Sequence, residues 1–509
     1  MNENLKEQKM VSEFPFFIWA TLAYALFYVV CLYKNGAGIT FPLFTAGTIA
    51  YFTLCMRKLN VAVKKYSIFY MVCIELLGLS TCLTDSWVIV LLNKCSIFFL
   101  IIVFLLHNFY ENKNWNFLEH IKAYFLATIV PIIFIGKPFT QYLAYKKNKV
   151  VNEENKIKSK ILYVILGIVI SIPLVIVVLF LLMSADAVFE NVFDKMFENL
   201  NIFTLIGDGI LSSILFVVVF FCAYMLLSFL SNYNVNGTKK ETEGGEPIIA
   251  ITVCAILSVI YVLFCGIQVV YLFIGSKASF TLPNGMTYAQ YAREGFFQLL
   301  FVCIINLILV LVGIYLFRES KILKVFLCII TSCTYIMIAS SAMRMLLYIQ
   351  YKYLTFLRVF VLWALLVIAL VMIGVMITIF KKDFNFFKYS TIVVTCLYLV
   401  LSFARVDYFV AKVNIDNMEK ETQYDFFKGI EVYDDYSYLF YNLSLDAAPA
   451  ILAYDDGSDP DEYWSYMDRR NQYIYDILDE TEDMGIRDFN ISRGIAKYKA
   501  MHTHYISEE

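Results

Sequence analysis

The sequence has few charged residues and few of the groups that support familiar catalysis. Only 17% of the 509 residues are Asp, Glu, Lys or Arg, and there are four histidines. The patterns G-x-x-x-x-G-K-[ST], H-E-x-x-H and G-x-S-x-G are all absent. ATP-driven work and the common zinc- and serine-dependent hydrolyses therefore lack their usual parts. We expect no catalytic residue and no cofactor, and an enzymatic activity has no support.

Cysteine is also absent from the last hundred residues of the chain, 408–509. All 12 cysteines precede residue 408, inside apolar segments, and no C-x-x-C or Cys/His cluster occurs. A segment without cysteine forms no disulfide, and a metal site of the Cys/His type has no ligands here. The thiols are expected to be packing residues, and we expect no metal.

What the sequence has in abundance is apolar surface. Hydrophobic residues make up 60% of the chain, against roughly 45–50% in soluble domains. A membrane-spanning helix needs about 20 apolar residues in succession. Eleven such runs are present, at 14–33, 38–56, 66–83, 87–107, 161–183, 206–230, 248–274, 295–317, 325–343, 357–380 and 389–407. The expected fold is an all-α, polytopic transmembrane helix bundle.

The distribution of basic residues predicts the orientation of the bundle. With the N-terminus in the cytoplasm, the inner segments carry 23 Lys and Arg, and the outer loops before residue 408 carry six. This asymmetry follows the positive-inside rule. The apolar run 123–135 would reach only about 20 Å as a helix, so we expect it to be interfacial or re-entrant. Counting it as a span would break the charge asymmetry.

The last hundred residues differ in composition from the rest. Residues 408–509 contain 22 Asp and Glu against nine Lys and Arg, together with many Tyr and Leu residues. We expect a small acidic, helical domain outside the cytoplasm. The expected regions are a membrane region at 1–107, a basic cytoplasmic loop at 108–160, a membrane core at 161–407 and the tail at 408–509.

Charged residues recur at the outward ends of several expected spans. In "LPNGMTYAQYAREGFFQLL", Leu282 to Leu300, a turn is followed by a helix that enters the membrane directly after Arg293 and Glu294. Asp186, Arg344 and Arg358 lie at other outward ends. Together they predict a charged outer vestibule that receives a substrate. The alternative is that these side chains only seat helix ends at the interface.

A second pair of charges lies deeper. Glu75 and Lys94 flank the turn at Asp85 and reach similar depths, about 14–15 Å from that turn by helical rise. A lone charge at the bilayer centre costs at least about 2.5–3.5 kcal/mol, so we expect Glu75 and Lys94 to form an intramembrane ion pair. A proton relay is the alternative.

Several motifs resemble one group of bacterial membrane proteins. These are "TYAQYAREGFFQLL", "SSAMRMLLYIQYKYLTFLR", "LSLDAAPAIL", "LLMSADAVF" and "RDFNISRGIAKYKA". They resemble the proteins grouped as domains of unknown function 4173 and 4153, from about Leu181 to near the C-terminus. The resemblance implies a multi-pass protein of a bacterial cytoplasmic membrane, without a known reaction or ligand. It also adds Tyr288, Tyr348 and Asp446 to the candidate residues near the outer face.

Two functions are compatible with these features. The first is a transporter, permease or lipid-handling protein with a vestibule for an anionic or zwitterionic substrate. The second is an envelope sensor or scaffold whose tail binds a partner. The lipid bilayer is an expected partner in both, and the lysines between Lys137 and Lys160 are expected to attract anionic lipid, each contributing about 1 kcal/mol. No nucleic-acid partner is expected.

Overall fold

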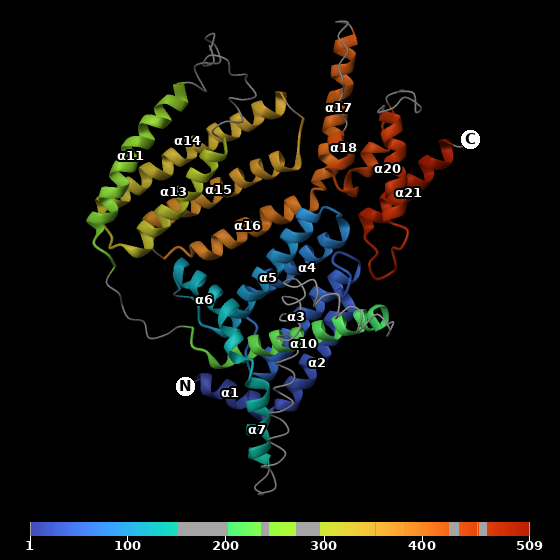
Figure 1. The fold of residues 1–509 in the computed structure, drawn as a ribbon. Coiled ribbons are helices and arrows are strands. Elements are labelled where there is room, and N and C mark those ends of the chain that lie inside the picture. Colours follow the sequence, from blue (N-terminus) through green and yellow to red (C-terminus); the bar gives the residue numbers. More distant parts are fainter. Residues whose placement is uncertain are drawn as a thin grey trace, which may run out of the picture.

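In the part of the chain that the structure describes, the fold is built of helices (Figure 1). The computed structural model describes residues 2–113, 115–149, 202–235, 244–270, 296–351, 353–381, 383–426, 437–455, 457 and 466–507. Within these ranges no strand occurs, and one isolated β-bridge joins Gly245 to Phe317. The all-α prediction is confirmed for this part of the chain. The expected span 161–183 lies outside the described residues.

Nine helices of the described residues are long and apolar enough to cross a membrane. They are Phe14–Leu32, Trp87–Phe109, Phe117–Phe134, Leu211–Asn232, Pro247–Val269, Phe296–Leu316, Lys321–Ile349, Phe356–Phe380 and Phe386–Phe403. A shorter apolar helix, α4 (Ser67–Leu83), and the helix α3 (Thr40–Lys58) lie between the first two. The chain is therefore a multi-pass membrane protein.

The helical segment that contains the apolar run 123–135 begins earlier than that run. It consists of α6 (Phe117–Ile129) followed by the 3-10 helix η1 (Val130–Phe134). A capping box begins α6: the Glu119 amide donates to Asn116 Oδ1 at 2.9 Å, and the Asn116 amide donates to Glu119 Oε2 at 2.7 Å. Because this cap starts the helix before Ala123, the combined segment is long enough to span.

The first group of helices forms a bundle at the N-terminal end of the chain. It contains α1 (Asn2–Ser12), α2 (Phe14–Leu32), α3, α4, α5 (Trp87–Phe109), α6 with η1, and α10 (Ile202–Asn232). The basic helix α7 (Lys137–Lys149) packs on α1 and α2, and Lys137 forms an ion pair with Glu7 at 2.7 Å. Although 161–407 was expected to form one region, α10 packs against α2 and η1 of this first bundle.

The second group contains α11 (Pro247–Val269), α13 (Phe296–Leu316), α14 (Lys321–Tyr351), α15 (Phe356–Phe380) and α16 (Phe386–Phe403). Helix α16 also packs on α4 of the first bundle (Figure 1). Beside this contact the fully buried Asn93 of α5 accepts hydrogen bonds from Tyr398 at 2.7 Å and Ser402 at 2.8 Å. A buried amide with satisfied bonds thus joins the two bundles.

The C-terminal helices form a third group with its own apolar core. They are α17 (Val406–Phe426), α18 (Ser437–Tyr441), η3 (Leu445–Ala447), α19 (Ala448–Ile451), α20 (Tyr466–Glu480) and α21 (Ile491–Ser507). Tyr466, Ile474 and Ile477 of α20 are buried, and they share a cluster with Ala496 and Ala500 of α21. These helices pack against the end of the first bundle at which α4 turns into α5 (Figure 1).

Candidate functional site

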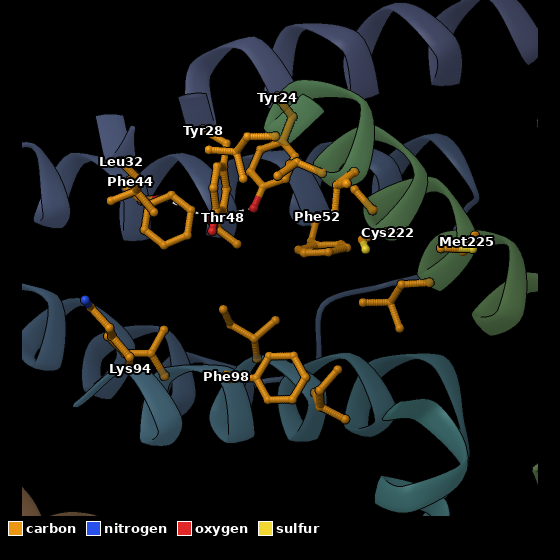
Figure 2. Close-up of a pocket in the computed structure, with 18 of the residues that line it drawn as sticks. Tyr24, Tyr28, Leu32, Phe44, Thr48, Phe52, Lys94, Phe98, Cys222 and Met225 are labelled. Carbon is orange, nitrogen blue, oxygen red and sulfur yellow. Dashed lines mark hydrogen bonds between the residues drawn. The ribbon is translucent and has the colours of Figure 1, made fainter. Parts of the chain in front are cut away.

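A cavity of about 670 Å³ lies inside the first bundle, between α2, α3, α5, α6 with η1, and α10 (Figure 2). Its wall is mainly aromatic and aliphatic. Tyr24 and Tyr28 come from α2, Phe44 and Phe52 from α3, and Phe98 from α5. The volume is within the range of about 300–1,000 Å³ that is usual for pockets that bind small molecules.

Residue spacing and residue size explain why the cavity forms. On α3, Phe44, Thr48 and Phe52 are four residues apart, so their side chains share one face of the helix. The other walls include small, buried residues, Ala127 of α6 and Ala223 of α10, which extend little into the cavity. Close packing is therefore interrupted between helices that are otherwise well packed.

The hydroxyl groups of the wall are mostly engaged with the protein. The Tyr24 hydroxyl lies 3.1 Å from Thr48 Oγ1, and Thr48 donates to the Phe44 carbonyl at 2.8 Å. Thr128 donates to the carbonyl of Tyr124 at 2.9 Å. Apart from the Tyr28 hydroxyl, which makes no hydrogen bond within the described part of the chain, the middle of the cavity is accordingly an apolar surface with satisfied hydroxyl groups.

Lys94 lies at one end of the cavity (Figure 2). Its side chain is exposed, and within the described part of the chain it makes neither a hydrogen bond nor an ion pair. The Nζ atom lies 5.9 Å from the centre of the Phe41 ring. It also lies beneath the α2–α3 loop, since a Cβ atom on Gly36 would be 3.0 Å from it.

Glu75 is not the partner of Lys94 among the described ion pairs. Its Oε2 atom instead accepts a hydrogen bond from Thr45 Oγ1 at 2.9 Å, so Glu75 faces α3. Similar depth predicted the pair, but depth leaves open the direction in which each side chain points around its helix. The expected contact is therefore replaced by a Glu75–Thr45 bond.

The expected vestibule residues are described in part. Arg344 and Tyr348 share one face near the end of α14, and the Arg358 guanidinium of α15 lies 4.3 Å from the centre of the Tyr348 ring. The buried Arg344 donates from Nη2 to Gln268 Oε1 at 3.2 Å. The structure thus brings three candidates to one end of the second bundle. The candidates Asp186, Tyr288, Arg293 and Glu294 lie outside the described residues.

A second polar centre fastens the C-terminal helices to the first bundle. Asp446 of η3 is 1% exposed. Its carboxylate accepts hydrogen bonds from the Thr84 hydroxyl, the Ser492 hydroxyl and the Asp85 amide, the last at 2.9 Å. We call the contacts of Asp446, Asp85 and Asp407 the tail junction.

The other two carboxylates of the tail junction also have protein partners. Asp85 accepts from Arg493 Nε at 2.5 Å, and Asp407 accepts from the Ser444 hydroxyl at 2.6 Å. Burial raises the pKa of Asp85, which the Arg493 guanidinium opposes. Burial likewise raises the pKa of Asp407, while hydrogen bonds from Ser444 lower it. No group of three or more His, Cys, Asp or Glu in the described chain is arranged to hold a metal ion.

The segment before α21 connects the tail junction to the loop above Lys94. Asn490 donates from Nδ2 to the carbonyls of Ala37 at 3.0 Å and Thr84 at 2.9 Å. The Ile39 amide donates to the carbonyl of Phe489 at 2.9 Å. The α2–α3 loop, which covers Lys94, is therefore hydrogen-bonded to the segment that precedes α21.

Sequence reasoning missed both the cavity and the tail junction. Asp446 drew notice only through the family resemblance, and Lys94 only as an expected partner of Glu75. One available signal was that Lys94 is a basic residue within an apolar span, with no acidic residue three or four positions away.

Comparison with known proteins gives one result. The model of the family described as Domain of unknown function (DUF4153) matches residues 71–454. The matched range includes Lys94, Asp85 and Asp446, and it begins well before the resemblance found from the motifs. No curated protein and no solved structure matches the chain. Because the family model covers most of the sequence, the chain belongs to the family Domain of unknown function (DUF4153).

Proposed function

We propose that this protein is a lipid-handling membrane protein, which takes up an amphiphile in the cavity of the first bundle. The observation that carries the proposal is an apolar cavity of about 670 Å³ walled by apolar helices. In a bilayer such a cavity is accessible to the hydrocarbon chains of lipids, and its aromatic wall offers a large contact area for them.

The break in the helix beside the cavity supports this proposal. Pro131 and Ile132 line the cavity within η1, where the α-helix gives way to a 3-10 helix. Proline has no amide hydrogen and interrupts helical bonding. Interrupted helices are a common feature of the binding sites of transporters. The same region contains strongly exposed apolar side chains, Ile132 and Ile133, which suit contact with lipid.

Two exposed cysteines provide a matched test. Cys222 lines the cavity, whereas Cys396 is exposed on α16 and does not line it. A diazirine-bearing lipid is added to the protein in nonionic detergent, and cross-linked peptides are mapped by mass spectrometry. We expect labels on α3 and α10, lost in Cys222→Trp and retained in Cys396→Trp. Equal labelling of both variants would contradict the proposal.

The outer vestibule remains part of the proposal as an entry route. Arg344, Tyr348 and Arg358 would receive the head of a substrate together with Asp186, Tyr288, Arg293 and Glu294. The contact between Arg358 and Tyr348 supports a defined site. The proposal includes eleven spans, a cytoplasmic N-terminus and an outer tail, with α6 and η1 interfacial or re-entrant although they are long enough to span. It also includes a bacterial cytoplasmic membrane, anionic lipid at α7 and a relation to domain of unknown function 4173.

A sensor or scaffold is the second candidate function, and the tail junction favours it. A partner that displaced α21 would loosen the loop above Lys94, because Asn490 bonds to that loop. The two functions separate in one measurement, cross-linking of intact cells through a photoreactive residue at Ile486, which is 92% exposed. Capture of one protein or wall component in stoichiometric amount would support the sensor, and labelling by lipid alone would contradict it.

A further inference from the structure

We infer that the amphiphile bound in the cavity carries a compact anionic group, a phosphate or a carboxylate, that contacts the Lys94 ammonium. This inference rests on the proposed function and adds the chemical class and the orientation of the ligand. The anionic group lies at the end of the cavity beneath the α2–α3 loop, and the hydrocarbon chain extends toward α10.

The first argument is the uncompensated charge of Lys94. Lys94 follows Trp87, the first residue of α5, by seven positions, which is about 10 Å along the helix. A charged side chain inside a span normally pairs with an opposite charge or faces a water-filled cavity. The nearest expected partner, Glu75, bonds to Thr45. Within the described residues the ammonium has only the Phe41 ring and the cavity before it.

The second argument is the distribution of polarity along the cavity. Among its described lining residues Lys94 is the only charged one. Asn35, at the same end, already donates from Nδ2 to the Cys31 carbonyl at 3.1 Å and to the Arg487 carbonyl at 2.9 Å. Figure 2 shows the Lys94 amine at one end and Cys222 with Met225 toward the other. One cationic end and a long apolar remainder match a ligand with one anionic end and one chain.

The third argument is the close approach of the α2–α3 loop to the Lys94 ammonium. Gly36 passes so close to the ammonium that an added Cβ would lie 3.0 Å from Nζ. A compact phosphate or carboxylate fits against such a loop more readily than a sugar or a polypeptide, because both of those are bulkier than the single-anion group.

The test uses the full-length protein in nonionic detergent with a diazirine-bearing dodecyl phosphate as the probe. Dodecyl phosphate, dodecanol and inorganic phosphate are the competitors, so that chain and anion are examined separately. The variants are Lys94→Met and a matched control, Lys388→Met. Lys388 is a lysine near the start of α16, and its Nζ atom lies 4.1 Å from the centre of the Tyr66 ring. Tyr66 precedes α4 and Thr84 follows it, so Lys388 lies at the end of α4 that is far from the tail junction.

We expect the probe to label the cavity, and dodecyl phosphate to displace it at least tenfold more effectively than dodecanol. Lys94→Met should weaken probe binding about tenfold or more, because a hydrogen bond to a charged group contributes about 1.5–3 kcal/mol. Lys388→Met should bind like the unchanged protein. Dodecanol should bind Lys94→Met as well as it binds the unchanged protein, which shows that the variant retains the cavity.

Three other results would overturn the inference, and each has a different consequence for the proposed lipid-handling function. If dodecanol and dodecyl phosphate compete equally and Lys94→Met has no effect, the cavity binds amphiphiles whether or not they carry a negative charge. If inorganic phosphate displaces the probe as well as dodecyl phosphate does, the ligand is a free anion. If the probe labels no residue of the cavity in the unchanged protein, the proposed lipid-handling function fails together with the inference.

Discussion

Replacing Asp446 tests the tail junction most directly. In Asp446→Ala the Thr84 hydroxyl, the Ser492 hydroxyl and the Asp85 amide all lose their acceptor inside a buried site. A buried donor left without a partner costs about 1–3 kcal/mol. The hydroxyls can rotate toward other acceptors, but the amide cannot. We therefore expect a loss of about 4 kcal/mol in the free energy that keeps α21 docked, a roughly thousandfold rise in the undocked population.

The two control variants separate charge from shape and from position. Asp446→Asn keeps one acceptor oxygen for the Asp85 amide, and its new NH₂ group can donate to Thr84 Oγ1, so its cost should be about 1 kcal/mol. Asp455 is an exposed tail carboxylate, and within the described part of the chain it accepts a hydrogen bond only from the nearby Gly457 amide, at 2.9 Å. Asp455→Ala should leave docking unchanged.

The assay is native-state hydrogen exchange of the α21 amides, whose rate reports the population of the open form. Asp446→Ala should accelerate exchange of the Ala496 and Ala500 amides about a thousandfold, and Asp446→Asn about fivefold to tenfold. An acceleration below tenfold in Asp446→Ala, or one equal to that of Asp455→Ala, would refute the reasoning. Apolar packing of α19 and α20 would then be what holds the tail.

Three further predictions follow from buried groups of the bundles and the tail junction. Gly47→Ala should lower the melting temperature in detergent, since the new Cβ would lie 2.2 Å from the Phe27 ring and overpacking costs about 1–3 kcal/mol. Gly136→Ala, which meets nothing within 4 Å, should not lower it, and equal melting points would contradict the packing argument. Asn93→Leu should cost about 2–3 kcal/mol, because the Tyr398 and Ser402 hydroxyls lose their acceptor; an unchanged melting temperature would show that the bundles join without this amide. Burial raises the pKa of Asp407, so its protonated form is favoured in the docked state. Docking is then strongest below the ordinary Asp pKa of about 3.9 and weakens as pH rises through the raised pKa. Slower α21 exchange on acidification, after correction for intrinsic rates, checks this. Asp407→Asn should weaken the pH dependence without abolishing it, because burial raises the pKa of Asp85 as well.

The membrane architecture could be predicted because it depends on local composition. A span is visible as a run of apolar residues, and the helices α2, α5, α10, α11, α13, α15 and α16 match the expected runs within a few residues. Helix α14 instead continues to Tyr351, well beyond the expected end at 343. The start of α6 was missed, although its capping box at Asn116 and Glu119 is also a local pattern. The acidic, aromatic tail was likewise visible as a change in composition.

The candidate sites could not be predicted in the same way. Helical rise placed Glu75 and Lys94 at one depth, yet a helix turns by about 100° per residue and packing decides which neighbour each side chain faces. Glu75 faces Thr45, whereas Lys94 faces Gly36 and the cavity. The cavity depends on how α2, α3, α5, α6 with η1, and α10 come together, and these helices are far apart in the sequence.

By itself the sequence determined that this is a helical, multi-pass membrane protein with an acidic C-terminal segment, because apolar runs and charge composition act locally. Only the tertiary structure decided that Lys94 faces a cavity and that Asp446 reaches Asp85, a residue 361 positions earlier. The physical reason is that these contacts arise from side-chain packing between distant helices. Periodicity along one helix specifies which face is apolar, and the neighbouring helices decide what that face meets.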